Sequence, residues 1–432
     1  MKRTALTCLL CLIPALAMSQ DKRDNDIFGV APPRTNSQRI EAEPIILEDK
    51  LRAANDKLQL GGLMYMRMRA SITDGTRIDD HKMSMPNLVD LYLDSRPNDR
   101  LRGFVRGRLN WDPTIDESAP LNEAQDIKQL SVLLDQLWLK TDIGRELFIT
   151  IGKQPIRWGT TRIWNPVDVV NGSRRVPLSL FDERTGVAMV KLHLPIESLG
   201  WNFYALTLVD EVETLDEIGL AGRAELVFWN VELGLTGAWR KDVDPKAGID
   251  ISAGVLDMDL TAEVGMTFED ELPTLQVSAG MEYGVRYSES DAIYIGAEWF
   301  YNQNGSTETD PIKLFSGETQ FFYTGRHYGA VFISLPSPGL WNDSTFALST
   351  VANLSDRSFL TRLDLIQRVK TFMTLQAYAT IHYGRPGELN LGPDAFDDTT
   401  RQIAQRLLYP DDPSRELTKP VVDLGLMLRI NL

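Results

Sequence analysis

The sequence predicts an all-β fold: a transmembrane antiparallel up-and-down β-barrel of about 18 strands (14 to 18) with long extracellular loops. Three observations predict it: an export signal at the start, a strand of alternating polarity at the end, and repeats of that alternation between them. A segment with an apolar residue at every second position forms a strand with one apolar and one polar face. In a transmembrane barrel the apolar face contacts the lipid and the polar face lines the lumen.

Residues 1–19 have the composition of a secretory signal peptide. Two basic residues precede an apolar run from Ala5 to Ala17, and small residues suit cleavage before Gln20. Both cysteines, Cys8 and Cys11, lie in this segment, so the exported protein is expected to have no disulfide and no cysteine-based metal site. No later stretch approaches the roughly 20 apolar residues that a membrane helix needs. Two classes of exported protein therefore remain possible, a soluble periplasmic protein and an outer-membrane barrel.

The C-terminal segment favours the barrel. It has an apolar residue at every second position, with Asp423, Gly425, Arg429 and Asn431 between them, and the last residue is Leu432. The apolar residues are Val422, Leu424, Leu426, Leu428, Ile430 and Leu432. A strand that ends the chain on a large apolar residue resembles the signal read by the barrel assembly machinery, although an aromatic residue is commoner there. The edge strand of a soluble sandwich is the alternative for this strand taken alone.

The same alternation recurs from Lys57 onward in segments of about 9 to 12 residues. Clear examples begin at Leu101, Met258 and Leu275. Connections alternate between long and short, which assigns the long ones to the outside. The long ones are residues 71–86, 112–130, 154–184, 302–324 and 384–419, and the short ones are 95–100, 142–146, 195–199, 229–231, 257 and 287–290. Residues 354–356 form an unexpectedly short outer connection. Tryptophans near strand ends fit an aromatic girdle: Trp111, Trp201, Trp229, Trp239 and Trp299.

The domain organisation follows from these segments. Residues 20–56 are predicted to be a polar periplasmic leader with a short helix near residues 46–57, and residues 57–432 the barrel. In the last long loop, Asp397 or Asp398 is expected to cap a short helix through Ile403 to Leu408, which Pro410 ends.

The inward faces of the strands are predicted to carry separated charges. Early strands place basic residues inward: Arg67, Arg69, Arg102, Arg106 and Arg108. Middle strands place acidic residues inward: Asp250, Asp257, Asp259, Glu263 and Glu282. About 18 strands put these sets on opposite walls and leave an aqueous channel, with a field across it that suits hydrophilic solutes. The alternative is a plugged lumen in which these residues pair with neighbours.

Residues 152–186 form the most distinctive segment, punctuated by glycine and proline and rich in arginine and tryptophan. It contains Gly152-Lys153-Gln154, then Trp158-Gly159, then Asn165-Pro166-Val167-Asp168. In this hairpin the chain resembles a porin-like group of outer-membrane barrels of largely uncharacterised function, and elsewhere only in architecture. The resemblance implies a solute channel or an exporter.

If this loop folds inward, its side chains are predicted to form a basic constriction that attracts anions, with tryptophans offering flat surfaces to sugars or rings. The residues are Lys153, Arg157, Trp158, Arg162, Trp164, Arg174 and Arg175. Anchoring of the loop to the barrel rim is an equal alternative. The formal net charge of -15 does not support nucleic-acid binding, and much of the acid lies in expected surface segments, residues 210–217, 269–271 and 394–398.

No catalytic motif is visible. The four histidines, His81, His193, His327 and His382, lack metal-ligand spacing, and no Gly-x-Ser-x-Gly elbow occurs. We therefore predict a non-enzymatic outer-membrane porin for passive diffusion of small hydrophilic solutes, without cofactor or metal. Expected partners are outer-membrane lipid and lipopolysaccharide, further copies of the chain, or a periplasmic protein. A plugged barrel with a structural or export role, and a hydrolase using His327 and His382, are the alternatives.

Overall fold

The computed structural model describes residues 57–119, 126–178, 183–270, 272–288, 291–307, 319–396, 398–408, 412 and 415–432. The predicted signal peptide and leader lie outside the described residues.

Nearly all of the regular secondary structure in the described residues is antiparallel β-sheet. The first strands are β1 (Leu58–Thr73), β2 (Lys82–Ser84), β3 (Asn87–Asn98), β4 (Leu101–Trp111), β5 (Leu130–Ile143), β6 (Leu147–Gln154), β7 (Val187–Ile196), β8 (Trp201–Leu208), β9 (Gly219–Phe228) and β10 (Val231–Arg240). The remainder are β11 (Val243–Val255), β12 (Met258–Thr267), β13 (Thr274–Arg286), β14 (Ala292–Asn302), β15 (His327–Pro336), β16 (Ser344–Asn353), β17 (Ser358–Lys370), β18 (Met373–Gly384) and β19 (Pro420–Asn431).

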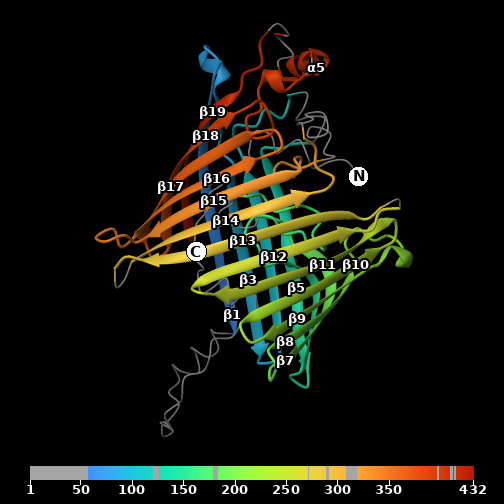
Figure 1. Ribbon diagram of the computed structural model, residues 1–432. Coiled ribbons are helices and arrows are strands. Elements are labelled where there is room, and N and C mark those ends of the chain that lie inside the picture. Colours follow the sequence, from blue (N-terminus) through green and yellow to red (C-terminus); the bar gives the residue numbers. More distant parts are fainter. Residues whose placement is uncertain are drawn as a thin grey trace.

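These strands form one closed sheet (Figure 1). Each strand pairs with its neighbours in sequence, and β1 closes the barrel by pairing with β19, from Leu63 opposite Asn431 to Thr73 opposite Pro420. The short β2 and the longer β3 both run along β1, so together they occupy one position in the wall. The barrel therefore has 18 strand positions, which confirms the predicted count. Closure leaves no sheet edge with unpaired backbone groups, the requirement for a sheet in lipid.

The outer surface of the barrel is apolar. In β19 the alternation predicted from the sequence holds: Leu424 and Leu426 are 42% and 49% exposed, whereas Asp423 and Met427, on either side of this pair, are buried on the inner face. Exposed tryptophans stand at strand ends, as expected for girdles at both membrane surfaces: Trp111, Trp239 and Trp299 at one end, and Trp229 and Trp341 at the other. Such an exterior suits a lipid environment.

Most connections alternate in length as predicted, although the outer turns at residues 241–242 and 354–357 are short. Long connections at residues 155–186, 303–326 and 385–419 lie at the end of the barrel that we assign to the outside, and tight turns such as 229–230 and 256–257 lie at the other. The predicted helix is present as α5 (Asp398–Leu408), which Figure 1 shows beyond the ends of β18 and β19. The short 3-10 turns are η2 (Ile78–Asp80), η3 (Leu215–Glu217) and η4 (Pro393–Ala395). Within the described ranges, no helix is long and apolar enough to cross a membrane.

Candidate functional site

The described part of the connection between β6 and β7, residues 155–178 and 183–186, lies against the inner wall of the barrel. In β12, Leu260 and Val264 are 37% and 41% exposed on the outer surface, so Glu263 faces the lumen, and its side chain is fully buried. Glu263 accepts hydrogen bonds from the backbone N–H of Thr160 at 2.6 Å and of Thr161 at 2.7 Å. The loop therefore folds inward and narrows the lumen on this side.

A second carboxylate on the same wall continues this contact. Glu298 in β14 accepts hydrogen bonds from the backbone N–H groups of Arg162 (2.9 Å), Ile163 (3.0 Å) and Trp164 (2.8 Å). Five successive amides, residues 160–164, thus point at two carboxylates. An irregular segment that enters a barrel needs partners for its backbone donors, and these two side chains provide them.

Two glycines provide the flat surface on which the next part of the loop rests. A Cβ atom on Gly265 would lie 2.5 Å from the Pro166 carbonyl oxygen, and one on Gly248 would lie 2.6 Å from Cγ1 of Val167. Any side chain at either position would push the loop off the wall. The Asn165-Pro166-Val167-Asp168 segment therefore lies directly on β11 and β12.

The two tryptophans of the loop anchor it from opposite sides. Trp164 is fully buried and stacks on Phe300 at a centroid distance of 5.5 Å. Its indole N–H donates to the Phe322 carbonyl at 2.9 Å. Trp158 is 5% exposed and packs in a cluster with Met189 and Leu206. Neither ring presents a face to a solute, so the anchoring alternative describes these two residues.

The arginines of the loop differ in their partners. Arg162 forms an ion pair with Glu282 at 3.0 Å, and Arg174 donates to the Gln276 side chain at 3.1 Å. Arg175 donates to the Arg162 carbonyl at 2.9 Å. Arg157 is exposed and donates only to the Thr161 carbonyl, at 3.4 Å, among its described neighbours.

The early wall carries the five predicted arginines, but carboxylates stand among them. Arg102 pairs with Asp94 at 2.9 Å, Arg106 with Asp135, and Arg108 with Asp90 at 2.8 Å. Arg67 pairs with Glu183 at 2.7 Å, and Arg69 donates to the Tyr378 hydroxyl at 3.0 Å. The positive charge expected on this wall is therefore largely compensated within it.

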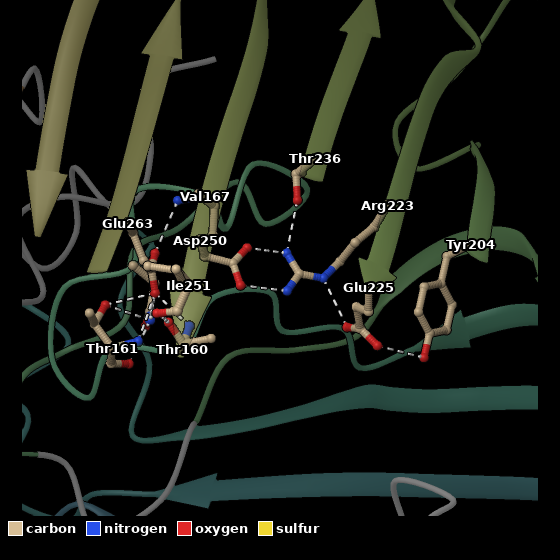
Figure 2. Close-up of polar contacts among 11 residues, drawn as sticks. Thr160, Thr161, Val167, Tyr204, Arg223, Glu225, Thr236, Asp250, Ile251 and Glu263 are labelled. Atoms are coloured by element: carbon tan, nitrogen blue, oxygen red, sulfur yellow. Dashed lines mark hydrogen bonds and ion pairs between the residues drawn. The ribbon is translucent and has the colours of Figure 1, made fainter. Parts of the chain in front are cut away.

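The acidic wall is compensated in part. Arg223 forms a bidentate ion pair with Asp250 at 2.6 and 2.8 Å and also pairs with Glu225 at 2.9 Å, as Figure 2 shows. Glu263 and Glu282 are engaged by the loop. The loop and the acidic wall are therefore in contact and do not face each other across the pore.

Two predicted residues, Lys153 and Asp257, lie elsewhere than expected. Lys153 pairs with Leu137, which is 52% exposed, so this lysine is on the outward face of β6 near its outer end. A Lys there reaches the headgroup region at little cost. Asp257 occupies the turn between β11 and β12 and does not line the wall, and Asp259 faces the lumen near that turn. Residue 257 was predicted both as a short inner connection and as part of the acidic wall, and only the first of these predictions is correct.

The sequence reading overlooked two lysines. Lys140 and Lys191 face the lumen on either side of Thr150 and form no ion pair within the described ranges. Lys140 lies 4.9 Å above the Phe148 ring. Next to them Tyr92, Phe104 and Trp138 stack in a row with centroid spacings of 5.6 and 5.3 Å. The alternation of β5 and β7 carries the signal that could have found both lysines.

The histidines do not form a catalytic group. Both ring nitrogens of His382 are engaged, Nδ1 with the Leu389 carbonyl at 2.7 Å and Nε2 with Asp423 at 2.9 Å. His327 stacks on Trp299 on the outer surface at 6.0 Å. His193 contacts Asn202, and His81 accepts from the Thr73 N–H. In the part of the chain that the structure describes, no group of acidic, histidine or cysteine side chains has the arrangement of a metal site.

Solved structures share this architecture. OccK2 (OpdF) of Pseudomonas aeruginosa is 12% identical, with a TM-score of 0.54 over 87% of this chain and 98% of that one. The chain has the fold of an outer-membrane porin. The outer-membrane protein OpdK of Pseudomonas aeruginosa (10% identity, 87% of this chain and 99% of that one) and OccAB3 of Acinetobacter baumannii (8% identity, the same coverage) each give a TM-score of 0.55.

The porin fold and the apolar outer surface place the chain in the outer membrane. The sequence itself is distant from known proteins: no protein-family model matches it, and no curated protein matches it. At these identities the likeness concerns the fold, so the solute and its contacts have to be argued from the residues of this chain.

Proposed function

We propose that the protein is an outer-membrane channel for the passive diffusion of small hydrophilic solutes, with a preference for anions. The observation that carries the preference is the pair Lys140 and Lys191, two inward-facing cations without an acidic partner in the described residues. Several arginines elsewhere on the inner wall, among them Arg102, Arg108 and Arg223, are instead paired with carboxylates. Uncompensated positive charge in a water-filled lumen raises the local concentration of anions.

The loop at residues 155–186 contributes by narrowing the lumen and by presenting Arg157. Its guanidinium is exposed, whereas Arg162 is neutralised by Glu282. This modifies the basic constriction expected from the sequence: the loop would offer one open cation, and the lysines of the wall below it would offer two more. The constriction and its charge are our proposal.

Aromatic rings beside the lysines suit organic solutes. Tyr92, Phe104 and Trp138 form a continuous stack along the wall next to Lys140. A ring face accepts the apolar face of a sugar or a small carboxylic acid while a lysine binds its charge. One structural neighbour, OccK2, has been solved in complex with glucuronate, an anionic sugar of this class. We propose small carboxylated solutes for this chain.

The test is ion selectivity in a planar bilayer. The reversal potential of the refolded protein in a tenfold salt gradient should indicate anion preference. Lys140→Gln with Lys191→Gln should reduce the ratio of anion to cation permeability severalfold, and Arg157→Gln should reduce it further. Lys153→Gln is the matched control, because this lysine is on the outward face of β6 and should leave the ratio unchanged. Equal ratios for all variants would contradict the proposed role of the lysines.

A plugged barrel with a structural or export role is the second candidate. The observation that favours it is a buried cluster inside the outer half of the lumen, where Trp164, Phe322 and Leu389 pack on Phe300 and Leu360 of the wall. A folded protein that conducts nothing, and that retains a stoichiometric partner in mild detergent, would support this candidate.

A further inference from the structure

A groove on the lipid-facing surface extends from the middle of β13 and β14 to the outer ends of β15 and β16. Its volume is about 540 Å³, and its lining is almost wholly apolar. Small residues form its floor: Ala279, Ala297, Gly329 and Ala352. Trp299, Val331 and Leu354 form its sides. Ligand pockets span roughly 300 to 1,000 Å³, so the groove has the size for an acyl chain or a pair of chains.

The groove is continuous with a polar surface on its β17 side. Thr350, which lines the groove, is hydrogen-bonded to Thr361 at 2.9 Å, and Thr361 to Tyr383 at 3.1 Å. Tyr383 is 43% exposed on the outer face of the barrel. Hydroxyl groups are uncommon on a lipid-facing surface, because a bilayer interior offers them no partner. The hydroxyl groups of Thr350, Thr361 and Tyr383 are placed to contact the ester and hydroxyl groups of a lipid, just below its headgroup.

Three arginines stand around the short outer turn above the groove. The backbone N–H of Arg326 donates to Ser355 Oγ at 2.9 Å, and that of Arg385 donates to the Arg357 carbonyl at 3.0 Å. All three side chains are exposed, and within the described ranges none forms an ion pair. Asp356, the acid of this turn, instead directs its carboxylate to Asn353, Ser358 and the Glu388 N–H.

This positive surface differs from the other outer connections. The connection after β8 carries Glu211, Glu213 and Asp216, and the one after β12 carries Glu269 and Asp270. Arginine guanidinium groups bind phosphate through paired hydrogen bonds. A cluster of basic residues next to an apolar membrane surface is the pattern that recognises an anionic lipid headgroup.

We propose that this groove, with Arg326, Arg357 and Arg385 above it, is a specific binding site for a phosphorylated glycolipid of the outer leaflet. The acyl chains would lie over Gly329 and Ala352, and Trp299 would stand beside them at the headgroup level. The phosphates would bind the arginines. The four-residue turn at 354–357 exposes the groove from above, and a longer loop there would cover it.

The test is a lipid titration of the full chain, purified from membranes and delipidated in detergent, followed by native mass spectrometry. The probe is hexa-acylated lipid A with two phosphates. The protein should hold one molecule preferentially. Arg326→Gln, Arg357→Gln and Arg385→Gln combined should weaken this binding at least tenfold, and each single change severalfold. Gly329→Leu, which fills the floor, should weaken it to a similar degree.

Two controls match these changes. Gly107→Leu adds the same side chain on the outward face of β4, where a Cβ would have nothing within 4 Å. Arg145→Gln removes an exposed arginine at the opposite end of the barrel. Both should bind as the parent protein does. The single-arginine variants keep the test valid if the triple variant does not fold. Folding of each variant is checked by comparing the gel mobility of heated and unheated samples.

Several results would overturn the proposal. Unchanged binding in the arginine variants and in Gly329→Leu would exclude the site. Equal affinity for phosphatidylglycerol would exclude a phosphorylated glycolipid as its specific occupant. If Gly329→Leu instead dissociates an assembly of several chains and leaves lipid binding intact, the groove is an interface between copies of this protein.

Discussion

At the scale of single residues, two inward-facing carboxylates determine where the long loop lies. Glu263 accepts hydrogen bonds from Thr160, Thr161 and Asn165, with distances between 2.6 and 3.1 Å. Glu298 accepts hydrogen bonds from the backbone amides of residues 162–164. A buried carboxylate is stable only when its lone pairs are matched by donors, and the loop backbone has donors that need acceptors. Each side thus stabilises the other.

Removal of one of these carboxylates should release the loop. For Glu263→Ala we expect the docking of the loop to weaken by on the order of 3 kcal/mol, because at least two buried amides lose their acceptor. Single-channel recordings should then show a larger and noisier conductance. Glu232→Ala is the control, since Glu232 also faces the lumen but accepts no hydrogen bond from the described part of the loop. Equal traces for the parent and Glu263→Ala would contradict this role.

Glu388 gives the outer segments a dependence on pH. It is 2% exposed and accepts from Phe322 N–H and the Tyr328 hydroxyl at 2.5 Å each, and burial raises the pKa of its carboxyl group from 4.5 to about 7. Between these two values the folded form binds more protons than the unfolded form does. The free energy of unfolding of these segments is therefore highest at low pH and falls as the pH rises through 7.

The expected loss is on the order of 3 kcal/mol between pH 4.5 and 8, since one pKa unit corresponds to about 1.4 kcal/mol. Hydrogen exchange at Phe322 and Leu389, corrected for the intrinsic pH dependence, should become faster over this range. In Glu388→Gln the change should be absent. Exchange that becomes slower with rising pH would contradict the assignment.

At the scale of elements, the position of the loop depends on glycines that the strands supply. Gly248 and Gly265 leave room for Val167 and Pro166, whereas Gly254, further along the same inward face of β11, has only Asp259 Oδ1 near it, at 3.9 Å. The strands were predictable because their alternation is local. The position of the loop inside the barrel was not predictable, because it depends on which strands, distant in sequence, present small residues and carboxylates.

A β-branched side chain at the contact should displace the loop. We expect Gly248→Val to increase proteolytic cleavage within residues 155–175 at least tenfold, since its Cβ would lie within 2.6 Å of Val167. Gly254→Val places the same side chain on the same strand away from the loop and should leave cleavage unchanged. Comparable cleavage of the two variants would show that the contact at Gly248 does not hold the loop in place.

At the scale of the whole molecule, the barrel has an apolar exterior and an inner wall in which charges are mostly paired. The sequence predicted the strand count, most of the long and short connections and the inward face of nearly every predicted charge, because each follows from period-two alternation. It did not predict the ion pairs between Arg108 and Asp90 and between Arg223 and Asp250. Pairing across strands depends on register, which alternation leaves open.

The central claim is that an open, anion-preferring path remains beside the docked loop. Single-channel conductance of the refolded protein, with the reversal potential in a salt gradient, tests it most directly. We expect a steady open level with anion preference that decreases when Lys140 and Lys191 are changed to Gln. A folded barrel that stays silent, or one that conducts with the same selectivity after both lysines are changed, would contradict it.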